Sequence, residues 1–232
     1  MRTVCVVCIA AIAVSFALTH ADVIAMFFAG RFAGIDITYS GREGTSFTSL
    51  RLSGLKVRLK GEDFSVSMDN ANFWPRWDES INAKKIIVDC VFDGVRFYSE
   101  KGAGLPGDTP QTSSLNALAR VPFQSEWEYR FVTFTGVMAL DDISVRSFRS
   151  ISDNILVSGS GKYRPRAGDF RADLHMAFAP ELSKALLMDF GDMFLTPERS
   201  GWYGVSIRLS GNTRDRSFHM RTDRLEINIR PE

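Results

Sequence analysis

Most of the chain alternates between apolar and polar positions with a period of two residues. The segment 170–178 is the clearest case, because Phe170, Leu174 and Met176 fall on one face of an extended chain. A β-strand with one buried face has this pattern. Similar short segments recur from residue 50 to residue 229, separated by glycines and polar turns. The pattern predicts a mainly β protein with about fourteen to sixteen strands in a curved, mostly antiparallel sheet, either groove-like or sandwich-like.

Three segments interrupt the alternation. Proline cannot donate to a strand ladder, so 74–77 (Trp-Pro-Arg-Trp) predicts a corner or a short helical turn. Pro180 and Glu181 begin a stretch of helical spacing that Gly191 can end, which predicts a helix. Another short helix is expected over 115–120. One or two short helices therefore accompany the sheet.

A glycine- and proline-rich stretch from Glu100 to Ser114 is the best linker in the chain. It separates an N-terminal β region, 31–99, from a C-terminal β region, 121–232, with the linker and short helix over 100–120. The pattern leaves open whether the two regions form one continuous sheet. If about fourteen to sixteen strands stack in one groove, they extend on the order of 70–75 Å.

Residues 1–30 have a different pattern from the rest. Sixteen uncharged residues, Thr3 to Leu18, follow Arg2. As a helix they are roughly 24 Å long, and extension to Ala21 approaches the about 30 Å of a bilayer core. We expect an uncleaved membrane anchor and juxtamembrane segment with a cytoplasmic N-terminus. The alternative is a signal peptide cut after Ala21.

Composition excludes several kinds of chemistry. The formal net charge of +1 gives no reason to expect nucleic acid as a partner. Beyond Cys5 and Cys8 the only cysteine is Cys90, so the β regions cannot form an internal disulfide. His175 and His219 lie between apolar neighbours, which places them on the solvent side of strands. Catalytic and metal-binding motifs are absent, and we expect no enzyme activity, no metal and no cofactor.

Glycine and serine at 159–161 follow a strand and do not precede a helix. A phosphate-binding loop would require the following helix. We therefore interpret this stretch as a turn or bulge.

Three segments carry a resemblance to a known family. These are Phe47 to Val57, in which a strand meets Leu-Ser-Gly-Leu at 52–55, then Leu156 to Tyr163, and Val205 to Asn212. Together with the N-terminal anchor, they resemble the AsmA-like proteins, bacterial relatives of repeating-β-groove lipid-transfer proteins. The type II secretion protein N resembles the same plan at a similar size.

The resemblance implies a curved sheet whose apolar inner face holds acyl chains in the periplasm, attached to the bacterial inner membrane by a single span. The expected function is lipid handling or support of envelope biogenesis, with membrane lipid as the partner. The alternative is a structural subunit of an envelope secretion system, with envelope-complex proteins or further copies of the chain as partners. An ordinary closed core is the competing interpretation of the apolar stripes. The candidate lining residues are Leu52, Val57, Phe64, Val66, Ile86, Val88, Phe170, Leu174 and Met176.

Overall fold

A computed structural model describes most of the two β regions. The predicted anchor, the linker and the expected helix over 115–120 lie outside the described residues. Of the helices that are described, none has the length and apolar character needed to cross a membrane. The described ranges are 35–45, 47–59, 64–99, 121, 127–139, 141–190, 195–215, 217–223 and 226–229.

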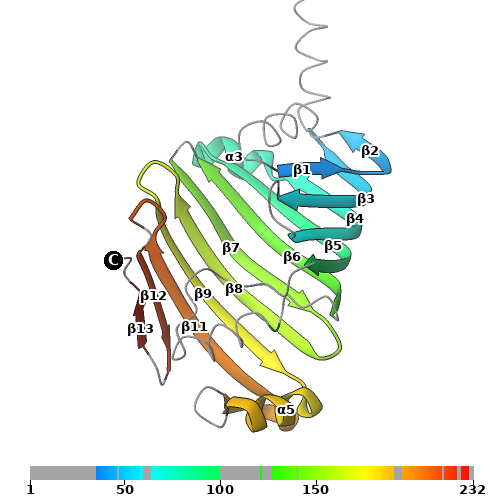
Figure 1. The fold of residues 1–232 in the computed structure, drawn as a ribbon. Helices are drawn as coiled ribbons and strands as arrows, with labels where there is room; N and C mark the ends of the chain where they lie inside the picture. Colours follow the sequence, from blue (N-terminus) through cyan, green and yellow to red (C-terminus); the bar gives the residue numbers. More distant parts are fainter. Residues whose placement is uncertain are drawn as a thin grey trace, which may run out of the picture.

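The described residues form one antiparallel sheet of thirteen strands (Figure 1). The strands pair in the order β1-β3-β4-β5-β6-β7-β8-β9-β11-β12-β13, with β2 also on β3 and β10 also on β11. This confirms the predicted mainly β, antiparallel fold. The bounds are β1 Ile35–Thr38, β2 Gly41–Thr45, β3 Ser49–Leu59, β4 Phe64–Pro75, β5 Ile86–Ser99, β6 Glu128–Ala139, β7 Asp142–Ile151, β8 Ile155–Arg164, β9 Asp169–Phe178, β10 Thr196–Pro197, β11 Tyr203–Asn212, β12 Ser217–Thr222 and β13 Glu226–Ile229.

The sheet is narrower than its strand number suggests. β1 and β2 pair with different parts of the same strand, β3, and β10 and β12 do the same on β11. The described path is therefore eleven strands wide. Ten spacings of about 4.8 Å give a width of about 48 Å. The expectation of on the order of 70–75 Å for fourteen to sixteen stacked strands is not met in the described part of the chain.

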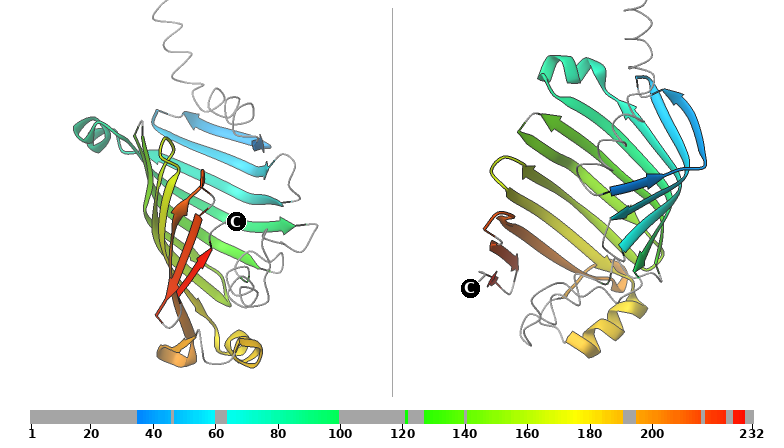
Figure 2. Two further views of the ribbon diagram at one scale, coloured as in Figure 1. Left: turned by 60° about the vertical axis from the view of Figure 1, so that its left-hand side comes forward. Right: turned by 45° about the horizontal axis from the view of Figure 1, so that its top comes forward.

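The two β regions join directly. β5 and β6, which flank the linker in the sequence, pair from Ile86↔Met138 to Arg96↔Glu128. The sheet is consequently continuous from β1 to β13, which the sequence pattern left open. Figure 2 shows its curvature, with β1 to β5 turning away from the later strands.

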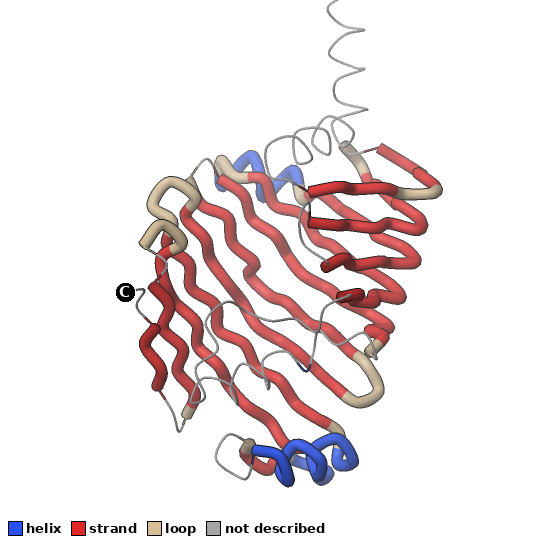
Figure 3. The backbone as a smooth tube through the Cα atoms, in the orientation of Figure 1, coloured by secondary structure: helices blue, strands red, loops and turns tan. Residues whose placement is uncertain are grey.

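The two α-helices of the described residues lie at opposite ends of the strands (Figure 3). α3 (Trp77–Ala83) follows β4 directly, so the 74–77 segment is the end of a strand and the start of a helix. α5 (Pro180–Phe190) begins at the proline that the sequence pattern indicated. A short 3-10 helix, η3 (Arg199–Gly201), precedes β11. We refer below to the α3 end and the α5 end of the sheet.

One face of the sheet carries the main buried cluster, and we call it the inner face. Ile87 and Val137, which pair on the opposite face, are also buried. Val157, Met176 and Val205 are register partners on β8, β9 and β11, and all three are buried. The opposite, outer face carries polar partners at the next position of the same strands, Ser158, His175 and Ser206. His175 thus lies on the polar face, as its apolar neighbours indicated.

The inner face keeps its apolar character across a bend in β3 to β6. Leu52 and Leu55 are both buried, although their odd separation would place them on opposite faces of a regular strand. Phe92 and Val95 on β5 show the same change of phase and also pack in the core. Gly54 and Gly94 lie at these two points with φ of +59° and +61°. Positive φ at glycine turns the chain without steric cost, so both halves of each strand present apolar residues to one side.

The stretch at 159–161 is not a turn, but a bulge does lie here. Gly161 pairs with Val145 and Gly159 with Phe148, so the extra residue of the bulge is on β7. β8 continues through it, with Gly159 opposite Leu174 and Gly161 opposite Ala172 on β9. The glycines alternate with Ser160, and both lie on the inner face. Because glycine has no side chain, it produced no apolar signal in the sequence at these two strand positions.

Candidate functional site: the exposed part of the inner face

Large apolar side chains are exposed on the inner face at the α3 end. Ile86, Met138 and Ile143 are direct register partners on β5, β6 and β7. Their exposed fractions are 47%, 48% and 41%. The same row of the sheet continues through Tyr163 and Phe170 on β8 and β9. An apolar row that crosses five neighbouring strands is thus partly accessible to solvent.

Small residues occupy the adjacent row. Gly136 on β6 pairs with Val145, which pairs with Gly161 on β8. A Cβ at Gly136 would meet nothing closer than 3.7 Å, and one at Gly161 nothing closer than 3.4 Å. There is therefore space above the backbone at both glycines, directly beside the exposed row.

Aromatic side chains in the third row, Phe73, Phe134 and Phe148, form the transition to the core together with Phe92 of the next row. Phe92 packs edge-to-face against Phe73 on one side and Phe134 on the other, with ring centroids 5.6 and 5.3 Å apart. Edge-to-face pairs of this kind add to the stability that burial provides. Phe73 and Phe92 contact the buried cluster. The aromatic row thus separates the exposed end of the inner face from its buried end.

The α5 end of the inner face is covered. Leu186 of α5 and Leu195 are buried in the same cluster as Phe178 and Ile155. Ser183 is fully buried and donates hydrogen bonds of 2.8 Å to the carbonyls of Phe178 and Ala179, so its hydroxyl is satisfied. The inner face therefore changes from a closed core at the α5 end to an exposed apolar surface at the α3 end.

The predicted lining residues are divided between these two environments. Leu52 and Met176 are buried in the closed core, and Val57 and Val66 are half-buried against it beyond the bend. The side chain of Phe64 lies outside the described residues. The other four lie on the inner face in the three rows nearest the α3 end: Ile86, Val88, Phe170 and Leu174.

Met138 and Ile143 belong to the exposed row and were missed by the sequence argument. Met138 could have been found by alternation from Phe134 through Gly136, but the glycine weakened the pattern. Ile143 was hidden by a bulge in β7. The register of β7 shifts between Val145 and Phe148, so Ile143 and Phe148 share a face despite their odd separation.

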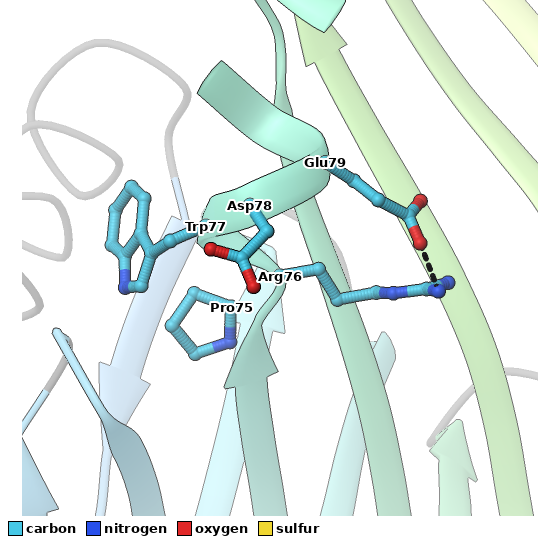
Figure 4. A pocket seen from close by; sticks show the side chains of 5 residues that line it. All are labelled: Pro75, Arg76, Trp77, Asp78 and Glu79. Atoms are coloured by element: carbon cyan, nitrogen blue, oxygen red, sulfur yellow. Dashed lines mark hydrogen bonds and ion pairs between the residues drawn. The ribbon is translucent and has the colours of Figure 1, made fainter. Parts of the chain in front are cut away.

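Two cavities lie away from the inner face. One, of about 480 Å³, is lined by residues 75–79 at the start of α3 (Figure 4). Arg76 there pairs with Glu79, and its Nε lies 3.7 Å from Oδ2 of Asp89. The other, of about 520 Å³, is lined by Leu156, Ala177, Trp202 and the segment 198–200. Arg76 and Glu79 of the first cavity pair with each other, and neither cavity contains a predicted lining residue.

A serine, a histidine and a carboxylate form a chain on the outer face. His175 Nδ1 lies 3.1 Å from Ser206 Oγ, and His175 Nε2 lies 3.0 Å from Glu198 Oε1. These groups have the composition of a hydrolytic triad. Ser206 is exposed, however, and the imidazole is 44% exposed, so water solvates both groups. We interpret the chain as a cross-strand contact that fastens the segment before β11 to β9.

The described residues contain no cluster of three or more His, Cys, Asp and Glu side chains that could hold a metal ion. Burial, and secondarily the charge of Asp89, raises the pKa of the Cys90 thiol to about 12. Burial also raises the pKa of Tyr129. Both side chains are therefore neutral at ordinary pH, and the inner face carries no charge at these two positions.

Comparison with known proteins gives no relative to this chain: no family model, curated protein or solved structure matches it. The resemblance to the AsmA-like proteins consequently stays a prediction. The candidate site depends on the geometry of the inner face alone.

Proposed function

We propose that the protein handles lipid by holding acyl chains on the exposed part of its inner face, as an AsmA-like protein attached to the bacterial inner membrane with its sheet in the periplasm. The observation that carries this proposal is the register-paired row of Ile86, Met138 and Ile143. Each of these side chains is more than two-fifths exposed, on the same face that forms the core.

The dimensions of the row suit an acyl chain. From Ile86 on β5 to Phe170 on β9 the row crosses four strand spacings, which is about 19 Å. The acyl region of one leaflet is about 15 Å thick, half of a bilayer core of about 30 Å. One acyl chain can therefore lie across the strands along this row. Each methylene that leaves water contributes about 0.8 kcal/mol.

The adjacent glycine row supports the same interpretation. Gly136 and Gly161 leave space beside the large side chains of the exposed row. An acyl chain that lies there contacts apolar atoms on two sides, because Phe134 and Leu174 of the third row border the glycines. Contact on two sides removes more apolar surface from water than contact with a flat face.

A photoactivatable fatty acid tests the proposal with the full-length chain in detergent. The predicted anchor also binds lipid, so the adducts must be assigned to peptides by mass spectrometry. We expect adducts on peptides that contain Met138 and Ile143. Met138→Glu with Ile143→Glu should lower their yield at least about tenfold, equivalent to 1.4 kcal/mol, because a carboxylate resists transfer into an apolar contact.

Phe131→Glu is the matched control. Phe131 lies on β6, is 51% exposed and points to the outer face. It should leave the adduct yield unchanged, whereas Met138→Leu should preserve labelling as a conservative replacement. Adducts confined to residues 1–30, or labelling that survives the double substitution, would contradict the proposal. Stable co-purification with secretion-system proteins and no acyl adduct would favour the structural-subunit alternative.

A further inference from the structure

Exposed apolar side chains gather at one end of the described molecule. Among the described residues, nine large hydrophobic side chains are exposed, and six of them belong to the α3 end. These six lie in the turn between β2 and β3, at the end of β4, on α3, and at the adjoining ends of β5, β6 and β7. The six are Phe47, Trp74, Ile81, Ile86, Met138 and Ile143; the other three are Tyr98, Phe131 and Met188.

An ordered contact holds the outermost part of this cluster. The Trp77 ring stacks on Phe47, with centroids 5.0 Å apart, and the indole N–H donates to the carbonyl of Phe47. Ile81 follows Trp77 by one helical turn, so it lies on the same side of α3. Phe47 is 51% and Ile81 73% exposed. Two elements distant in sequence are thus fastened together to present apolar atoms to solvent.

Cationic side chains flank the apolar cluster. Lys84 and Lys85 follow α3 directly and are both exposed. The acidic groups nearby include Asp78 and Glu79 in the first turn of α3. Asp141 and Asp142, which precede Ile143, pair with Arg166 and Lys162. Glu79 is engaged by Arg76, and its other oxygen lies 3.6 Å from Nη1 of Arg146. Tryptophan, phenylalanine and isoleucine beside lysine form the composition that proteins present to the interface of a bilayer.

The exposed Lys84 and Lys85 beside the apolar residues favour an anionic bilayer over other occupants of this surface. β1 is the first described strand, and residues 1–30 before it contain the predicted anchor. In Figures 1 and 2, β1 and α3 lie in the same half of the molecule, away from α5. β1 therefore lies in the half of the molecule that carries the exposed apolar cluster, although its first residue, Ile35, pairs with Leu59 at the end of β3 away from Phe47. We propose that the α3 end docks on the surface of an anionic lipid bilayer, with Phe47, Trp77 and Ile81 in the interface and Lys84 and Lys85 at the head groups.

The docking surface adjoins the exposed row of the inner face along the chain. Ile86 begins β5 immediately after Lys84 and Lys85. If the proposed function is correct, an acyl chain that leaves the bilayer enters the exposed row at Ile86, next to the lysines at the head groups. Docking itself does not depend on that function, because Phe47 and Ile81 lie outside the row that holds the acyl chain.

Photo-cross-linking in nanodiscs tests the docking. Benzoylphenylalanine is placed at position 81 or, in a second protein, at position 188 of the full-length chain. The nanodiscs contain phosphatidylcholine with or without phosphatidylglycerol. Met188 is 87% exposed on α5, at the opposite end, and provides the matched control. We expect lipid adducts from position 81 and at least about a tenfold lower yield from position 188.

Two further measurements test whether docking depends on the charge of the lysines. Lys84→Gln with Lys85→Gln should lower the adduct yield from position 81 in anionic nanodiscs and leave it unchanged in neutral ones. Added salt should act in the same direction as the lysine substitutions. Equal yields from positions 81 and 188 would overturn the proposal. Adducts from position 81 to protein only would also overturn it, and would assign the surface to a second copy of the chain or to a protein partner. A lipid adduct at position 81 with no acyl adduct at Met138 would keep the docking and reject the proposed function.

Discussion

A Cβ added to Gly94 would lie 2.2 Å from Oδ2 of Asp69 on the neighbouring strand. Asp69 is also held by Arg96, whose Nη1 donates to Oδ1 over 3.2 Å. Gly94 has a φ of +61°, in the region that favours glycine. Its position in β5 is where the apolar residues change phase, from Phe92 to Val95. The bend of the sheet therefore requires a residue at position 94 that adopts a left-handed backbone conformation and has no side chain.

Gly94→Ala should lower the free energy of unfolding by about 2–4 kcal/mol. About 1–2 kcal/mol comes from the left-handed backbone, and the rest from displacement of Asp69. Urea-induced unfolding followed by tryptophan fluorescence measures the change. Gly136→Ala is the control, since its Cβ would meet nothing closer than 3.7 Å and its φ is not positive. It should change the stability by less than about 0.5 kcal/mol. Equal effects of the two substitutions would show that the bend does not depend on Gly94.

A leucine at position 161 should block the inner face without unfolding it. Gly161→Leu places a large side chain in the space beside the exposed row, where the nearest atom to its Cβ is 3.4 Å away. Labelling by the photoactivatable fatty acid should fall several-fold, while the urea midpoint stays within experimental error. Ser160→Leu is the control, because the neighbouring position points to the outer face. Retained labelling in Gly161→Leu would exclude the glycine row from the acyl-binding surface.

Alternation in the sequence predicted the fold class but not the shape of the sheet. Strict alternation over 170–178 identifies β9, and Pro180 marks the start of α5 because proline suits the first turn of a helix. The phase change at Gly54 is visible in the sequence, yet it does not show that Gly94 bends in the same way two strands later. Pairing between strands creates that bend, so the local sequence pattern does not predict it.

The candidate site was predictable only in part, for a related reason. Ile86 and Val88 alternate locally and were identified from the sequence. Alternation does not distinguish a buried face from an exposed one, so it grouped them with Leu52 and Met176 of the closed core. Ile143 lies beyond the bulge in β7, where the shifted register breaks the period of two. Exposure of the row depends on what covers each end of the sheet, and α5 covers the other end.

Stability should fall as pH rises above about 9. Burial raises the pKa of Cys90 from its ordinary value of 9.0 to about 12 in the folded state. Below pH 9 the thiol is neutral in both states and has no effect. Between pH 9 and 12 the unfolded thiol ionises and the folded one does not, so the unfolded state gains by up to about 1.4 kcal/mol per pH unit. Urea unfolding at pH 8, 9, 10 and 11 measures the slope.

Cys90→Val isolates this contribution, because Tyr129 also has a raised pKa and remains in both proteins. The variant should lose less stability than the original chain between pH 9 and pH 11. Parallel curves for the two proteins would show that the Cys90 thiol reaches water in the folded state. Slow modification of the native chain at this cysteine by a thiol reagent at pH 8 provides a second measurement of the same burial.

Substitutions in α5 should change the stability of the fold without changing acyl binding. Leu186 is buried in the core cluster, so Leu186→Ala should lower the free energy of unfolding by about 2–5 kcal/mol through the loss of buried apolar contacts. Met188 is 87% exposed, and Met188→Ala should change the stability by less than about 0.5 kcal/mol. Urea unfolding provides both values.

Below the unfolding transition, Leu186→Ala should still accept the fatty-acid probe at Met138, because α5 covers the closed end of the inner face. A selective loss of labelling in folded Leu186→Ala would instead place the acyl chain in the core at the α5 end.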